Sequence, residues 1–211
     1  MKREYILGVL FFGGVWGISE AVLGDALYAS NVPYASVPLT VVGLAVLTIA
    51  RSYFPQRGTA TLIAACAMLY KLLNSPFFGC HLLGVLITGA CYDLMFDVLK
   101  IRLKSLAAAA TTYLSYAAFA VMITYLFRYD HWVQGGLTQV LRHIFIGGSM
   151  AALACACTVP LVARIGERLK SRSAMPFGLL RSPIPGSISA LTLGLWAFAV
   201  VTCLRSYPSI L

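Results

Sequence analysis

The amino-acid sequence predicts an all-α protein, a polytopic integral membrane bundle with a six-helix core and a seventh C-terminal helix. Seven apolar stretches follow one another with short loops between them, and most approach the roughly 20 residues that a helix needs to cross the hydrocarbon of a bilayer. Hydrophobic residues make up 60% of the chain and charged residues 11%, and the mean hydropathy is +0.84. A soluble protein of this composition would be covered with apolar surface.

The first apolar stretch has a basic N-terminal flank and therefore has to be compared with a signal peptide. It exceeds twenty residues and carries Glu20 and Asp25 toward its far end, which favours a retained helix. The boundaries of the other apolar stretches are set where charged residues, Pro or Gly interrupt the apolar sequence. We expect membrane helices at residues 5–27, 36–54, 58–74, 77–99, 105–127, 137–163 and 187–204.

The loops between these stretches define the domain organisation. Residues 28–35 carry no charge and are expected to pack over the helix ends, while residues 51–57 form a tight basic turn around Pro55. Residues 164–186 are basic at first and then rich in Pro and Gly, which is typical of a surface helix that ends in a linker. We therefore divide the chain into a membrane core (1–163), a basic loop (164–186) and a final helix with its tail (187–211).

Lysine and arginine predict the orientation of the bundle. By the positive-inside rule, the basic loops lie in the cytoplasm, the N-terminus with them, and the C-terminus lies outside after seven crossings. Anionic lipid headgroups account for the net charge of +9, so membrane lipid is an expected partner and nucleic acid is not. The residues on the basic side are Lys2, Arg3, Arg51, Arg57, Lys100, Arg102, Lys104, Arg164, Arg168, Lys170, Arg172 and Arg181.

Ionisable residues within apolar stretches are the candidate functional residues, because a charge in the bilayer costs at least about 2.5 kcal/mol unless it is paired or solvated. A group of them is expected at similar depth on the outer side, roofed by residues 28–35, Tyr129, His131 and Trp132. This pattern indicates a substrate-binding pocket; the alternative is that Glu20 pairs with Lys71 structurally while Arg142 reaches headgroups. The predicted pocket residues are Glu20, Lys71, Asn74, His81, Arg142 and His143.

Two acids on the fourth stretch lie on the opposite side. Asp93 and Asp97 are four residues apart and share a helix face. We expect Asp97 to meet Lys100 or Arg102 at the interface. Asp93 lies one turn deeper and needs a partner that the sequence does not identify, so it is a structural or functional acid.

Small residues line one face of the first stretch, where Gly13, Gly17 and Ala21 recur at intervals of four. Such a face allows another helix to approach closely. Two alternatives remain open: packing within this chain, or docking against a separate membrane subunit.

The sequence predicts no catalytic residue, no cofactor and no metal site. It contains no HExxH, P-loop or GxSxG motif, and Ser19 and Ser149 stand only in a bare G-x-S context. A metal site is chemically reasonable but has no diagnostic spacing; its ligands would be Glu20, Cys80, His81 and His143. The six cysteines lie mostly in apolar segments, where they behave as small hydrophobic residues.

The first six stretches resemble the substrate-binding S components of energy-coupling factor (ECF) transporters. The residues that carry the resemblance are the short basic N-terminus, the Gly13, Gly17 and Ala21 face, the long outer first loop and the Gly-rich stretch 84–94 that ends in Asp-Leu. Residues 14–21 are also similar to uncharacterised bacterial membrane proteins. The resemblance implies a bacterial cytoplasmic membrane, a vitamin, precursor or metal ion as solute, and docking of the Gly13 face on a transmembrane scaffold with two cytoplasmic ATPases.

The sequence thus favours a non-enzymatic membrane component of a small-solute uptake system with an outward-facing pocket. A non-transporting accessory or assembly protein is the alternative, followed by an intramembrane enzyme.

Overall fold

The computed structural model describes residues 3–70, 79–172 and 186–206, and every regular element in these ranges is helical. The all-α fold class is confirmed. Three π-helical turns extend α4 (Leu94–Val98), extend α5 (Met122–Leu126) and join α6 to α7 (His143–Gly147). The α-helices are α1 (Arg3–Ala29), α2 (Ser36–Tyr53), α3 (Thr59–Leu69), α4 (Gly79–Asp93), α5 (Lys104–Val121), α6 (Asp130–Arg142), α7 (Gly148–Arg172) and α8 (Gly186–Ser206).

The described helices have the length and composition of a membrane protein. Five of the helical segments in this part of the chain are long and apolar enough to cross a membrane, and α3 and α8 contribute shorter apolar segments. Large apolar side chains point outward from several helices, among them Leu153 (70% exposed), Leu193 (71%) and Phe145 (63%). Side chains of this kind can face lipid, and helices are suited to it because they satisfy their own backbone hydrogen bonds.

Two boundaries differ from the sequence-based expectation. Residues 164–172 continue α7 as one helix and do not form a separate surface helix, because the polar residues extend the helix beyond its apolar part. The expected loop before residue 137 is largely helical, since α6 begins at Asp130. Gly136, with φ 55° and ψ −152°, breaks the helix there in a conformation that favours glycine.

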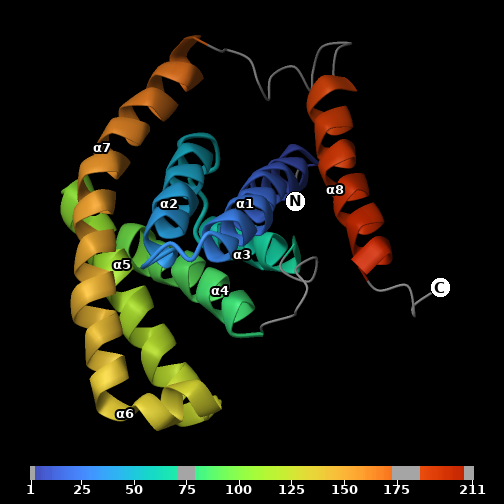
Figure 1. The fold of residues 1–211 in the computed structure, drawn as a ribbon. Coiled ribbons are helices and arrows are strands. Elements are labelled where there is room, and N and C mark those ends of the chain that lie inside the picture. Colours follow the sequence, from blue (N-terminus) through green and yellow to red (C-terminus); the bar gives the residue numbers. More distant parts are fainter. Residues whose placement is uncertain (1–2, 71–78, 173–185, 207–211) are drawn as a thin grey trace.

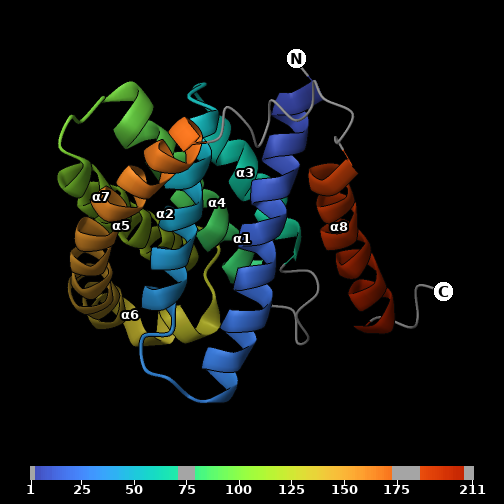
Figure 2. The same cartoon turned by 90° about the horizontal axis from the view of Figure 1, so that it is seen from above.

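The helices form a bundle with two chemically different ends (Figures 1 and 2). α7 packs on α2 and α5, α3 packs between α1 and α4, and α8 packs on α1. We call the end with the 30–35 turn and α6 the pocket end. The opposite end, which we call the basic end, carries the last turns of α7 together with Arg51, Arg57, Lys100, Arg102 and Lys104.

The small-residue face of α1 packs inside the chain. A Cβ on Gly13 would lie 2.4 Å from the Cys66 Cβ of α3, and a Cβ on Gly17 would lie 2.4 Å from the Tyr70 ring that follows α3. Ala21 is also buried. In the structure, this face packs within the chain, which is the first of the two alternatives. α3 covers the surface that a separate subunit would need.

Asp93 has a definite partner, the N-terminus of α3. Its carboxylate accepts hydrogen bonds from the backbone N–H of Ala60 (3.2 Å) and of Thr61 (2.7 Å), and from the Thr61 hydroxyl (2.6 Å). The first N–H groups of a helix have no partner within the helix, and the helix dipole favours an anion there. Asp93 thus ties α4 to the start of α3.

Asp97 pairs with Arg51 of α2, where the sequence had suggested Lys100 or Arg102. The helical turn ends at Val98, and Lys100, two residues later, adopts a left-handed conformation with φ 51°, so the chain changes direction shortly after Asp97. The Arg51 guanidinium also donates to the Phe96 carbonyl (3.2 Å) and lies 5.5 Å from the centre of the Phe96 ring. This contact fixes α2 against the end of α4.

We predict that Asp93→Ala lowers the free energy of unfolding by about 1–3 kcal/mol, because it leaves the buried N–H of Ala60 and the partly buried N–H of Thr61 without an acceptor. Thermal unfolding of the purified protein in mild detergent measures the effect. Asp93→Asn should lose less, since its amide oxygen still accepts. Asp130→Ala removes an exposed carboxylate from the first turn of α6 and is the control, with an expected loss below about 1 kcal/mol because an exposed charge there gains only the interaction with the helix dipole. Equal stability of the Asp93→Ala and Asp130→Ala proteins would contradict this role of Asp93.

We also predict that Gly13→Ala destabilises the bundle by about 1–3 kcal/mol, because the added methyl overpacks the contact with α3. Gly194→Ala on α8 is the matched control, since a Cβ there meets nothing within 4 Å. The control should unfold at the wild-type temperature or slightly above it, as alanine favours a helix. A Gly13→Ala protein with wild-type stability would show that α1 and α3 do not touch here.

Candidate functional site

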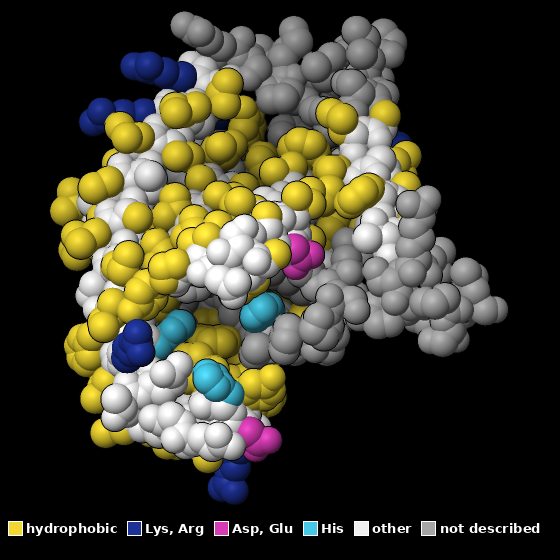
Figure 3. Space-filling view, viewed as in Figure 1, with side chains coloured by type: hydrophobic (Ala, Val, Ile, Leu, Met, Phe, Trp, Pro, Cys, Tyr) yellow, Lys and Arg dark blue, Asp and Glu magenta, His cyan; other side chains and the backbone are white. Residues whose placement is uncertain are grey.

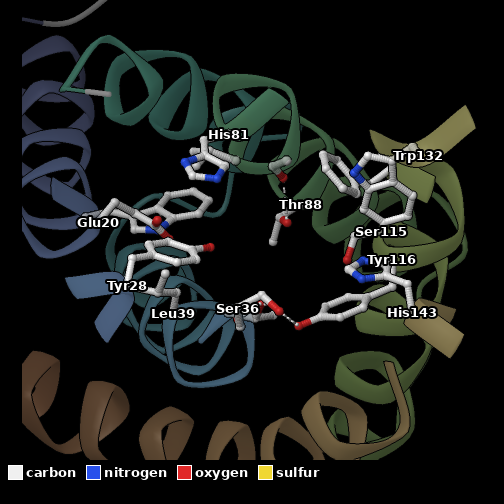
Figure 4. A pocket seen from close by; sticks show the side chains of 15 residues that line it. Glu20, Tyr28, Ser36, Leu39, His81, Thr88, Ser115, Tyr116, Trp132 and His143 are labelled. Atoms are coloured by element: carbon white, nitrogen blue, oxygen red, sulfur yellow. Dashed lines mark hydrogen bonds between the residues drawn. The ribbon is translucent and has the colours of Figure 1, made fainter. Parts of the chain in front are cut away.

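The pocket end contains a cavity of about 250 Å³ between α1, α2, α4, α5, α6 and the π-helical turn before α7. In Figure 3 the histidines gather around a hollow in this face, and Figure 4 looks into the pocket. Polar, aromatic and small side chains share the lining, which consists of Trp16, Glu20, Tyr28, Ser36, Leu39, Thr40, His81, Gly84, Val85, Thr88, Ser115, Tyr116, Phe119, Trp132 and His143.

One wall of the cavity carries an acidic side chain, that of Glu20 on α1. Glu20 is 7% exposed and accepts a hydrogen bond from the indole Nε1–H of Trp16 one turn earlier on α1 (3.2 Å). Trp16 is itself fixed, because a Cβ on Gly43 of α2 would lie only 2.8 Å from its ring. Next to Glu20, the His81 imidazole stacks on the Tyr28 ring with centroids 5.3 Å apart and planes at 13° (Figure 4). This wall therefore presents a carboxylate, an imidazole and two aromatic rings.

The opposite wall is an aromatic cluster around His143. Its imidazole stacks on Tyr116 at 4.8 Å and 19°, and the Trp132 ring meets it edge to face at 5.1 Å and 80°. Phe119 completes the cluster at 5.7 Å. The π-helical turn His143–Gly147 starts at this residue, and π-turns often occur at functional sites.

Hydroxyl groups connect the two walls, and most of their donors are already used. Thr88 donates to the Gly84 carbonyl (2.9 Å), Thr40 to Ser36 (2.8 Å) and Ser115 to Thr112 (2.9 Å), all within their own helices. The Tyr116 hydroxyl donates to the Ser36 hydroxyl across the pocket (3.1 Å; Figure 4). These hydroxyl groups therefore offer mainly acceptor lone pairs to a ligand, beside the imidazoles and aromatic faces of the two walls.

The predicted pocket residues divide into three groups. Glu20, His81 and His143 come together around the cavity. Arg142 is exposed and does not line it. Lys71 and Asn74 lie outside the described residues. Of the expected roof, Trp132 lines the cavity and Tyr28 belongs to its wall, while Tyr129 and His131 are exposed.

Sequence reasoning missed the aromatic and hydroxyl residues inside the helices. Tyr116 and Phe119 are three apart on α5, and Ser36 and Thr40 are four apart on α2, so each pair shares a helix face. Such pairs in apolar helices were a usable signal. The signal is weak, because uncharged polar residues are common in membrane helices and have several roles there.

The other sequence candidates lie elsewhere. Ser149 shares a hydrogen bond with Tyr113, and Ser19 donates to the Trp16 carbonyl; neither lines the cavity. Among the residues whose side chains are described, no three His, Cys, Asp or Glu side chains group as metal ligands. Comparison of the chain with protein-family models, curated proteins and solved structures gives no significant match.

Proposed function

We propose that this protein is the solute-binding membrane component of an uptake system and that the pocket end takes up a small solute. The observation that carries the proposal is the pocket itself, in which a carboxylate, two imidazoles and several aromatic rings from separate helices surround one cavity. A few convergent polar groups in a mainly apolar cavity are the usual form of a small-molecule site.

The pocket faces outward in this proposal. The lysines and arginines of alternate loops gather at the basic end, so the positive-inside rule puts that end and the N-terminus in the cytoplasm. The pocket end then opens to the outside of a bacterial cytoplasmic membrane, and the C-terminus lies on the same side. The resemblance to ECF S components supports the same arrangement and supplies a class of partner, a scaffold subunit with ATPases.

The lining chemistry favours a solute with a cationic nitrogen or an electron-poor aromatic ring. Aromatic faces attract cations, and the effect grows when water is excluded. Glu20 adds a carboxylate, and none of the described lining residues is a lysine or arginine. A volume of about 250 Å³ lies below the range of about 300–1,000 Å³ for drug-sized ligands, so the solute is small.

The carboxylate and the two imidazoles do not favour a metal ion as the solute. Glu20 and His81 lie on one wall, whereas His143 is packed among aromatic rings on the other (Figure 4). Metal ligands must converge on one point within about 2.0–2.2 Å of the ion. An organic solute that spans the cavity can contact both walls.

Affinity purification in mild detergent tests the partner and the solute together. We expect mass spectrometry to identify a small organic molecule, a membrane scaffold with ATPases, or both. A clean protein without either would favour the accessory role.

A binding assay with defined probes tests the pocket. We expect tryptamine, an aromatic cation, to raise the unfolding temperature and benzoate, an aromatic anion, to leave it unchanged, with at least a tenfold preference for the cation. His81→Ala should weaken tryptamine binding at least tenfold because it removes the imidazole that stacks on Tyr28 in the wall that carries Glu20. His131→Ala changes an exposed histidine outside the lining and is the matched control. Equal effects of both variants, or stronger binding of benzoate, would refute the pocket chemistry.

A further inference from the structure

A second cavity, of about 690 Å³, lies at the basic end, between α2, the end of α4, the start of α5 and α7. Its lining brings together six cationic side chains that are far apart in the sequence: Arg51, Arg57, Lys100, Arg102, Lys104 and Lys170. The positive-inside bias by itself requires only that such residues lie on one side of the membrane. It does not require that three separate segments direct them to one cavity.

The described lining contains only two carboxylates to balance these cations. Asp97 pairs with Arg51, and Glu167 accepts a hydrogen bond from Lys104 (2.7 Å). Six cations against two acids leave an excess of four positive charges around one cavity. Like charges held together in this way create a positive potential that favours an anion.

Arg51 has a fixed position within this cavity. Its guanidinium is held by Asp97, which is 4% exposed, by the Phe96 carbonyl and by the Phe96 ring. The turn after α4 is also fixed, because Lys100 adopts φ 51° and the Ile101 N–H donates to the Met95 carbonyl (3.2 Å). This turn brings Lys100, Arg102 and Lys104 to the cavity within five residues.

We propose that the basic-end cavity binds a phosphate group. Arginine forms paired hydrogen bonds with phosphate oxygens, and lysine contributes a mobile point charge, so this mixture of side chains suits a phosphate dianion or diester. The group belongs either to an anionic phospholipid headgroup or to a free phosphorylated solute. The site is independent of the aromatic pocket at the other end of the bundle.

The test uses the full chain in mild detergent with two probes. Pyrophosphate binding is measured by thermal shift, and native mass spectrometry compares retention of phosphatidylglycerol with that of phosphatidylcholine. Arg102→Gln/Lys170→Gln removes two cavity cations that take part in neither ion pair described above. Arg164→Gln/Arg168→Gln removes two exposed cations of α7 outside the lining and is the matched control.

We expect the cavity pair to weaken binding of at least one probe tenfold or more, and the control pair to change it less than threefold. Pyrophosphate binding without lipid preference assigns the site to a free phosphorylated solute. Preference for phosphatidylglycerol without pyrophosphate binding assigns it to a headgroup. Equal losses in both pairs would show diffuse surface charge and overturn the proposal, as would a wild-type protein that binds neither probe.

Discussion

The arrangement of the bundle depends on two carboxylates at the end of α4. Asp93 accepts hydrogen bonds from the N-terminus of α3, and Asp97, one turn later, pairs with Arg51 of α2. A helix that starts within the bundle must find acceptors for its first N–H groups, because lipid supplies none. Asp93 meets this need for α3. The two acids thereby hold three helices together at the basic end, and the same helices or their neighbours form the pocket at the other end.

The sequence predicted the helices well because an apolar stretch can be recognised from one segment alone, without knowledge of its neighbours. For example, the helix predicted at residues 36–54 differs by one residue from the observed helix α2 (Ser36–Tyr53). It predicted the ends of the sixth segment less well, since α6 and the last turns of α7 are polar helices that hydropathy does not detect. The partner of Asp93 was beyond sequence reasoning, because backbone N–H groups carry no signal in the amino-acid sequence.

The candidate site was predictable as far as its ionisable residues and two of the expected roof residues, Tyr28 and Trp132. The positions of Glu20, His81 and His143 along their helices predicted that they lie at the same end of the bundle. All three line the cavity. Depth does not specify the direction in which a side chain points around a helix, which is why Arg142 was grouped with them although it is exposed. The aromatic rings of Tyr116 and Phe119, which give the pocket much of its chemical character, required the packing of α5 against α6 and α7 to be known.

The surroundings of α1 restrict how a partner subunit can dock. Gly13 and Gly17 face α3, and on the neighbouring side a Cβ on Gly14 would lie 3.2 Å from Leu195 of α8. The Trp196 indole of α8 donates to the Leu10 carbonyl (3.3 Å), and its ring meets Tyr70 at 5.0 Å. α8 therefore contacts the same helix that, by resemblance, would have met the scaffold. A scaffold that approached α1 from this side would have to displace α8, so α8 itself, with Leu193 and Phe198 exposed, is the surface that such a partner would meet first.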